Sequence, residues 1–441
     1  MGLFNFWRKQ KTTAALEGKP QKLERFVSKD FCFKIGGEAG FGIMSAGLTF
    51  SKIASRSGYH VFDYSEYPSI VRGGHNVMQT TVSSEPVRSQ LRHTNFLVAL
   101  NQETVDFHKH ELIDGSGVLF DSEQGVSVKD VPSEVHLFDV PINKIAREIG
   151  GSEIMRNTAA MGAAIGLLGG KLQYLKDLIK EEFSDKKAEV VEKNYATCQA
   201  GYDYVLNHYK DLISNVLTAK SKVKPQIVMS GNEAAALGAI AGGMQFAAIY
   251  PMTPISAVLH TLAPLQEEFK FIYKQPEDEI SAINMAIGAS FAGARAMTAS
   301  SGGGFCLMTE AYGLAGMTET PLVILEGMRG APATGLPTWT EQGDLRFVLH
   351  AHQGDFPRIV LAPGDIDETF HFMMQAFNLA DKYQTPVLVL ADKQILESHK
   401  SSELYNFKDY KLNRGKFINN KQDNYKRYEI TEDGISPRSI P

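Results

Sequence analysis

The chain has few cysteines, and this scarcity excludes several kinds of protein. Three cysteines occur among 441 residues, and none of them stands in a CxxC pair or at a metal-ligand spacing from a histidine. A disulfide framework, a structural zinc site and an iron–sulfur cluster held by one chain each need more thiolates, or closer ones. We therefore expect Cys32, Cys198 and Cys306 to be three buried or inert thiols.

The sequence also lacks an excess of positive charge and a long apolar run. Its formal net charge is -5, whereas a nucleic-acid surface needs clustered lysine and arginine. The uncharged stretch 234–258 is interrupted by glycines, a glutamine and two prolines, so it does not predict a membrane span. Residues 1–28 have no apolar core of a secretory signal and are expected to form a tail. Together these features predict a cytoplasmic protein with neither a nucleic-acid nor a membrane partner.

A standard nucleotide fingerprint is missing as well, although a glycine-rich turn is present. The turn Gly36–Gly42 follows an apolar strand and leads into a helix, but it matches neither GxGxxG nor GxxxxGK[ST]. Free backbone N–H groups at a helix start favour an anion such as a phosphate. Arg72, in "VRGGHN", can bring a cation to the same ligand. Tight packing of the turn, and a surface β-turn around Arg72, are equally good explanations, and a nucleotide-dependent dehydrogenase stays an alternative.

What the sequence does contain is two series of short apolar strands that alternate with helical patterns, which indicates an α/β protein. Residues 29–214 are expected to form one α/β domain, and the lysine-rich segment 215–225 a linker. In residues 226–397 the apolar runs are typical of parallel strands covered on both faces, which predicts a doubly wound sheet. Residues 398–441 are polar and turn-rich, and they predict a linker toward a missing C-terminal domain.

Two loops of the second domain hold side chains suited to a carboxylate substrate. Thr253 stands between Pro251 and Pro254 after the strand "FAAIY", and Arg329 and Thr338 follow the strand "PLVILEG". Catalytic residues gather beyond the carboxyl ends of parallel strands. An arginine can bind a carboxylate by two parallel hydrogen bonds, to which a threonine hydroxyl adds a third.

Two further patterns have a plain structural explanation. Glu277, Asp278 and Glu279 open a predicted helix after a proline, and acids in a first turn complement the helix dipole. His350 and His352 have the spacing of one strand face, but no third ligand is in evidence, so no metal site is predicted.

Several long motifs, in order, resemble the α subunit of 2-oxoacid:ferredoxin oxidoreductases, particularly the 2-oxoglutarate-type members in which γ and α regions are fused. The resemblance begins near residue 31 and covers nearly all of the remaining chain. It is carried by "GGEAGFG", "VRGGHN", "RNTAAMGAAIG", "YPMTPIS", "EDEISAINMAIGASFAGARAMTASSGGGF", "RGAPATGLPTWTEQGDL" and "YKRYEITEDGISPRSIP".

The resemblance implies an enzyme that uses thiamine diphosphate to decarboxylate a 2-oxoacid, passes electrons singly to ferredoxin and transfers the acyl group to coenzyme A. The first domain would be the γ part, and the second the pyrimidine-binding half of the cofactor site. The implied roles are contact of Glu279 with the aminopyrimidine N1′, substrate binding by Thr253, Arg329 and Thr338, and coenzyme A binding by Gly37, Gly40, Gly42 and Arg72.

Departures from the family pattern qualify this picture. Trp339 stands where a basic residue usually follows the "LPT" threonine, so it cannot pair with a second substrate carboxylate. The family's GDG motif for diphosphate and Mg²⁺ and its cluster cysteines are missing, which implies that Mg²⁺ and a [4Fe–4S] cluster belong to a separate β subunit. The family's α chain normally continues past "GISPRSIPG", so a further domain is expected. A catalytically inert assembly subunit of the same fold stays an alternative.

Overall fold

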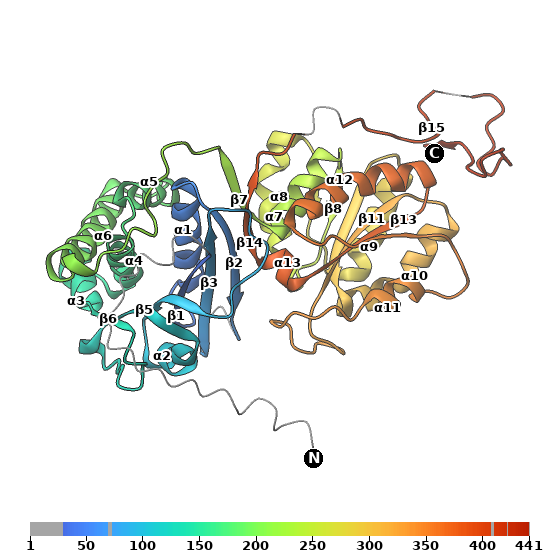
Figure 1. The fold of residues 1–441 in the computed structure, drawn as a ribbon. Helices are drawn as coiled ribbons and strands as arrows, with labels where there is room; N and C mark the ends of the chain where they lie inside the picture. Colours follow the sequence, from blue (N-terminus) through green and yellow to red (C-terminus); the bar gives the residue numbers. More distant parts are fainter. Residues whose placement is uncertain (1–29, 69–72, 407–409, 421, 441) are drawn as a thin grey trace, which may run out of the picture.

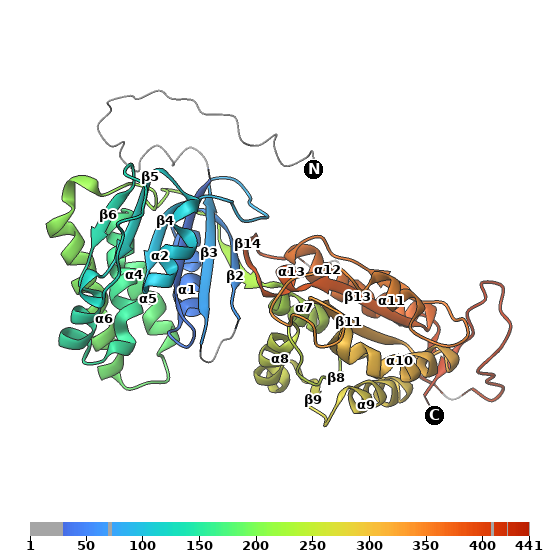
Figure 2. The same ribbon diagram turned by 90° about the horizontal axis from the view of Figure 1, so that it is seen from below.

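The structure is a computed structural model, and it describes residues 30–68, 73–406, 410–420 and 422–440. Two α/β lobes lie side by side (Figure 1), and each is built on one β-sheet. The view from below shows helices on both faces of each sheet and the two lobes meeting near β7 and β14 (Figure 2). The predicted α/β class is thus confirmed.

The first lobe contains a mixed eight-stranded sheet in the order β6-β5-β4-β1-β3-β2-β14-β7. β1 runs parallel to β4 but antiparallel to β3, which in turn pairs antiparallel with β2. The bounds are β1 (Phe31–Glu38), β2 (His60–Glu66), β3 (His75–Ser83), β4 (Thr94–Ala99), β5 (Leu112–Phe120), β6 (His136–Asp139), β7 (Gln226–Ser230) and β14 (His399–Glu403).

Helices cover this sheet unequally. The larger core lies on the face of α1, where the rings of Phe33 and Phe50 stack at 3.7 Å. α4 and α6 can approach closely because Gly162 has no side chain. A Cβ at this position would lie 2.1 Å from the carbonyl oxygen of Cys198. The helices are α1 (Ile43–Arg56), α4 (Arg156–Leu167), α5 (Leu172–Glu182) and α6 (Ala188–His208) on that face, α2 (Gln102–His108) with a smaller core on the other, and the short α3 (Ile142–Ile145).

The second lobe contains a six-stranded sheet in the order β12-β13-β11-β10-β8-β9, and every adjacent pair is parallel. This confirms the parallel, doubly wound sheet that the apolar runs predicted. The strands are β8 (Phe246–Ala248), β9 (Ile272–Lys274), β10 (Ala296–Ser301), β11 (Leu322–Met328), β12 (Ile359–Leu361) and β13 (Pro386–Asp392).

Helices lie on both faces of the second sheet, each over its own apolar core. α7 begins with a capping box in which the Ser230 hydroxyl accepts from the Glu233 N–H and the Glu233 carboxylate accepts from the Ser230 N–H. One face carries α7 (Gly231–Ala241), α8 (Ser256–Phe269), α12 (Ile366–Tyr383) and α13 (Lys393–Glu397), and the other carries α9 (Glu279–Phe291), α10 (Gly302–Met317) and α11 (Leu345–His350).

The first and last strands of the second half of the chain, β7 and β14, belong to the first sheet, contrary to the sequence-based expectation. Residues 226–230 and 399–403 were assigned to the second domain and to a linker, yet both form strands at the edge of the first sheet. His399 pairs with Ser230, and Lys400 pairs with Phe62 of β2. Such pairings join residues far apart in the chain, so local periodicity cannot reveal them.

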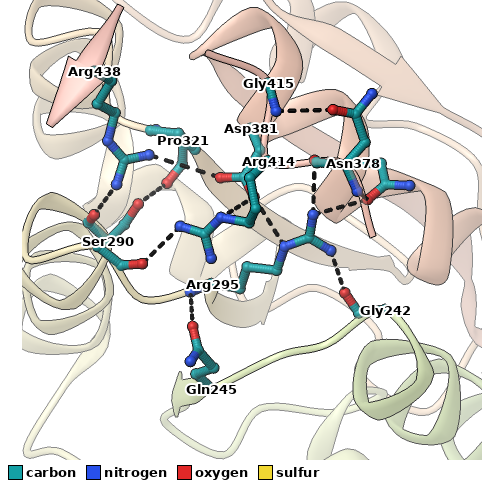
Figure 3. Close-up of polar contacts among 12 residues, drawn as sticks. Gly242, Gln245, Ser290, Arg295, Pro321, Asn378, Asp381, Arg414, Gly415 and Arg438 are labelled. Carbon is teal, nitrogen blue, oxygen red and sulfur yellow. Dashed lines mark hydrogen bonds and ion pairs between the residues drawn. The ribbon is translucent and has the colours of Figure 1, made fainter. Parts of the chain in front are cut away.

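The segment after β14 is more ordered than the expected linker, because a buried charge cluster holds it to the second lobe (Figure 3). Asp381 of α12 lies 2.9 Å from Arg295 Nε, 3.1 Å from Arg414 Nε and 3.7 Å from Arg438 Nη1. Burial lowers the pKa of Arg438 to about 10. Within this segment, β15 (Phe417–Ile418) and β16 (Arg438–Ser439) form a small parallel sheet.

Two smaller predictions concern the cysteines and a histidine pair. Cys32 and Cys198 are buried, and Cys306 is exposed on α10. Partial burial of its thiol and the nearby charge of Asp344 raise its pKa, so exposure does not make it a ready nucleophile. His350 ends the short α11 instead of lying on a strand with His352.

Candidate functional site

Thr253 and Arg329 meet at the carboxyl end of the second sheet. Thr253 lies in the loop between β8 and α8, and Arg329 directly follows β11. Arg329 Nη1 donates a hydrogen bond of 2.8 Å to the carbonyl oxygen of Thr253. Burial lowers the pKa of Arg329, but an arginine starts so far above neutral pH that it stays a cation. The structure thus brings together two of the three predicted substrate contacts.

The three acids before α9 have three different environments. Glu277 is exposed, whereas the Asp278 side chain caps the helix by accepting from the Ser281 N–H at 2.7 Å. Glu279, the first residue of the helix, is only 4% exposed. An acidic side chain can complement the helix dipole while it is exposed to solvent. The helix dipole therefore does not explain why Glu279, alone among the three acids, is buried.

A glycine makes the space that Glu279 occupies. A Cβ on Gly304, in the first turn of α10, would lie 2.6 Å from Glu279 Oε1 and 2.0 Å from the hydroxyl oxygen of Ser300. The Ser300 hydroxyl in turn lies 3.9 Å from the sulfur of Met252, next to Thr253. Glu279 therefore belongs to the same strand-end cluster as Thr253 and Arg329, with Ser300 and Met252 between them.

Thr338 lies apart from this contact, on a cavity between the two lobes. Its loop is closed by hydrogen bonds from the Gly330 N–H to the Trp339 carbonyl, at 2.9 Å, and from the Trp339 N–H to the Leu336 carbonyl, at 3.0 Å. Trp339 is 60% exposed. This interlobe cavity measures about 410 Å³ and is lined by Tyr64, Glu66, Tyr67, Pro68, His75, Val77, Phe107, His108, Thr338 and Trp339.

The glycine turn opens onto a second cavity, in the first lobe. Gly40 and Gly42 have φ of 88° and 72° and line a space of about 540 Å³ at the start of α1. Gly37 has a different position, inside β1, where a Cβ would lie 2.9 Å from Ile43 Cδ1. Its small size serves packing between β1 and α1. Arg72 lies outside the described residues.

Sequence reasoning missed Arg156, which lines the same glycine-turn cavity. Its guanidinium carbon lies 4.1 Å from the centroid of the Phe41 ring, and the Asn157 amide donates to the Phe41 carbonyl. Both residues begin α4, so the first turns of two helices face one cavity. The stretch "MRNTAA" was a usable signal, because an arginine at a helix start does not complement the dipole there.

The part of the chain that the structure describes has no group of three or more His, Cys, Asp or Glu side chains that could hold a metal ion. Across the same residues, no helix combines the length and the apolar composition needed to cross a membrane.

Comparisons with known proteins assign a family to each lobe. Residues 32–204 match the family described as pyruvate ferredoxin/flavodoxin oxidoreductase. Residues 237–440 match the family described as pyruvate flavodoxin/ferredoxin oxidoreductase, thiamine diP-bdg. The second lobe is thus a thiamine diphosphate-binding domain.

Among curated proteins, the chain is 35% identical to the 2-oxoacid:ferredoxin oxidoreductase subunit alpha of Sulfolobus sp, over 92% of this chain and 71% of that protein. It is 46% identical to a 2-oxoglutarate synthase subunit of Archaeoglobus fulgidus, over 38% of this chain and 48% of that protein. Among solved structures, it is similar to 2-oxoglutarate:ferredoxin oxidoreductase from Magnetococcus marinus with 2-oxoglutarate, coenzyme A and succinyl-CoA bound. That likeness has a TM-score of 0.85 and 34% identity, and it covers 94% of this chain and 72% of that one.

Proposed function

The chain belongs to the α subunits of the 2-oxoacid:ferredoxin oxidoreductases, and from this premise we propose how its residues divide the reaction. The reaction oxidises and decarboxylates a 2-oxoacid, reduces ferredoxin and forms an acyl-CoA. The single observation that carries the proposal is the strand-end cluster, in which a buried carboxyl, Glu279, and a buried cation, Arg329, both lie at the carboxyl ends of strands of the second sheet. 2-Oxoglutarate is the favoured substrate, because the Magnetococcus marinus structure holds it.

Glu279 is the residue that would hold the pyrimidine ring of thiamine diphosphate. Its burial at a helix start and the space left by Gly304 fit a carboxyl that accepts or donates one hydrogen bond at a fixed point. When bound, thiamine diphosphate would supply the carbanion chemistry that decarboxylation of a 2-oxoacid needs. Glu279 orients the ring and holds the proton at the pyrimidine nitrogen, which sets the tautomer.

Arg329, Thr253 and Thr338 would bind the substrate. The Arg329 guanidinium pairs with the carboxylate next to the 2-oxo group, and its bond to the Thr253 carbonyl fixes the loop that presents the Thr253 hydroxyl. Thr338, on the interlobe cavity, contacts the rest of the substrate.

Coenzyme A would bind the first lobe at the glycine-turn cavity. Gly40 and Gly42 leave backbone N–H groups at the start of α1 free for a phosphate, and Arg156 adds a cation on the opposite wall. Gly37 supports this turn from within β1, and Arg72 remains a candidate from sequence.

The cofactor site is half of a shared site, which a β subunit would complete. Mg²⁺ and a [4Fe–4S] cluster belong to that partner, because cluster cysteines and the diphosphate motif are missing from this sequence. Ferredoxin is the electron acceptor implied by the family.

The test is to purify the chain with and without its β partner, and to follow 2-oxoacid- and CoA-dependent reduction of a viologen dye. We expect activity in the complex alone. Activity of the single chain would contradict a shared site, and an inactive complex would favour the inert assembly subunit. A panel of 2-oxoacids in the same assay tests whether Trp339 shifts the preference from 2-oxoglutarate to more apolar substrates.

A further inference from the structure

A chain of polar side chains crosses the first lobe and ends at the interlobe cavity. Lys34 Nζ and Glu111 Oε2 form an ion pair, and the Thr94 hydroxyl donates to the same oxygen at 3.0 Å. Glu111 Oε1 lies 2.8 Å from His108 Nδ1, and His108 Nε2 lies 3.0 Å from His75 Nε2. The lack of a side chain at Gly36 makes room for the His75 ring, since a Cβ there would lie 2.8 Å from its Cε1.

The charges along this chain fix where its protons reside. Burial alone would raise the pKa of Glu111, but hydrogen bonds from His108 and Lys34 outweigh it and lower that pKa to about 2. Glu111 is therefore a carboxylate. In the neutral tautomer of His108 whose Nδ1 donates to this carboxylate, Nε2 accepts from His75 Nε2.

His75 is consequently a neutral base. Burial is the largest cause that lowers the pKa of His75, to about 4. Its remaining nitrogen, Nδ1, is buried and has no hydrogen-bond partner among the residues that the structure describes. A buried acceptor without a partner is costly, and a ligand that brings a proton would satisfy it.

This series of polar side chains connects two cavities. His75 and His108 line the interlobe cavity together with Thr338, while Lys34, Glu111 and His108 line a smaller cavity of about 180 Å³ that Arg92 also borders. The glycine turn contacts the residue before His75, because the Ala39 N–H donates to the Gly74 carbonyl at 3.1 Å. A long ligand held at the glycine turn can thus extend toward His75.

Resting on the proposed function, we propose that His75 is the base that takes the proton of the coenzyme A thiol, and that His108 and Glu111 are positioning residues that receive and stabilise it. The S–H bond breaks, its proton goes to His75 Nδ1, and the His75 Nε2 proton moves to His108. The sulfur electron pair forms the S–C bond of the acyl-CoA, while the bond that would join the acyl carbon to thiamine diphosphate would break and leave its electron pair on the cofactor. One proton per turnover then leaves through the smaller cavity, as the balanced reaction requires when ferredoxin takes both electrons.

Other titratable groups also bear on His75, so its pH response is a property of its whole surroundings. Besides the polar chain itself, the ionisable side chains that face it or neighbour it are Tyr64, Glu66 and Tyr67 on the cavity wall and Glu38, its register partner on β1. Burial, followed by the charge of Glu66, raises the pKa of Tyr64 to about 12, so this tyrosine does not compete as a base.

The experiment compares His75→Gln and His108→Gln with wild type in the complex with the β subunit. The rate of CoA-dependent acyl transfer is measured by rapid quench with saturating CoA, between pH 6.5 and 9. We expect His75→Gln to lower this rate about 100-fold at pH 7. The deficit should shrink as the pH rises toward about 8.5, where an alkyl thiol ionises without a base. His108→Gln should show the same pH pattern with a smaller loss.

His110→Gln is the matched control, because His110 is exposed two residues after His108. It should keep the wild-type rate at every pH. A wild-type rate in His75→Gln, or a loss that is equal at all pH values, would overturn the role as a base. If His75→Gln does not fold, the His108→Gln variant provides the test. A deficit in its rate that shrinks as the pH rises supports the proposal, and a wild-type rate or an equal loss at all pH values overturns it. A wild-type complex without CoA-dependent ferredoxin reduction would instead refute the proposed function.

Discussion

The guanidinium of Arg329 donates to the carbonyl oxygen of Thr253 across 2.8 Å, which ties the loop after β11 to the loop after β8. Because the contact uses one of five N–H donors, the other donors remain for a substrate carboxylate. One cation can therefore bind the substrate and hold in place the loop that presents a hydroxyl to it. Several expected results depend on this arrangement and on the clusters around it.

Replacing Arg329 by Met should lower kcat/KM for the 2-oxoacid by roughly ten- to a hundredfold, about 1.5 to 3 kcal/mol, because a charge-assisted contact is lost. Thiamine diphosphate binding should persist, and calorimetry on the complex checks it. Arg346→Met is the control, since Arg346 is exposed on α11. Equal losses in both variants would argue against carboxylate binding.

Glu279→Gln should slow exchange of the cofactor C2 proton for deuterium, whatever 2-oxoacid is used, because a neutral amide does not set the tautomer as a carboxyl does. NMR of quenched cofactor from the assembled complex measures this rate. Glu277→Gln, which changes an exposed acid two residues earlier, should exchange like wild type. Wild-type exchange in Glu279→Gln would return the acidic run to a helix-dipole role.

Gly40→Leu should raise the apparent KM for CoA, because a side chain would enter the glycine-turn cavity. The left-handed φ of 88° adds strain of about 1–2 kcal/mol for any such residue. Gly125→Leu separates the two effects, since Gly125 has φ of 77° and open space around it. An equal change in KM for both variants would point to strain alone.

Asp381→Asn should destabilise the second lobe by about 3–5 kcal/mol, because it leaves buried arginines without their carboxylate. Urea unfolding checks the loss, and hydrogen exchange should show the segment after β14 opening first, since Arg414 and Arg438 hold it (Figure 3). Asp355→Asn, an exposed change, should leave both unaltered. Unchanged exchange in Asp381→Asn would mean that other contacts anchor the segment.

Local signals predicted much of this protein. Short apolar runs bounded by turns gave the strands of the parallel sheet, because a buried strand needs little information from elsewhere. The rule that loops at the carboxyl ends of parallel strands meet placed Thr253 near Arg329, although they lie 76 residues apart. The same rule did not predict that Thr338 lies apart from Thr253 and Arg329. The position of Thr338 depends on how its loop folds back on itself.

Contacts made only in three dimensions could not be predicted. Pairing of β14 with β2 and β7 needs the first sheet to exist already, and the polar segment around Arg438 gave no sign that one buried aspartate would hold it. The same holds for His75 and His108, which are 33 residues apart and gain their chemistry from each other.

The paired strands β7 and β14 also determine how the molecule can be rearranged. The polypeptide leaves the first sheet after Ser230 and returns to it at His399, the two being register partners. The second lobe is therefore an insertion between two neighbouring strands at the edge of the first sheet. Neighbouring attachment points also suit a cassette, which a gene can gain, lose or exchange without breaking the host sheet.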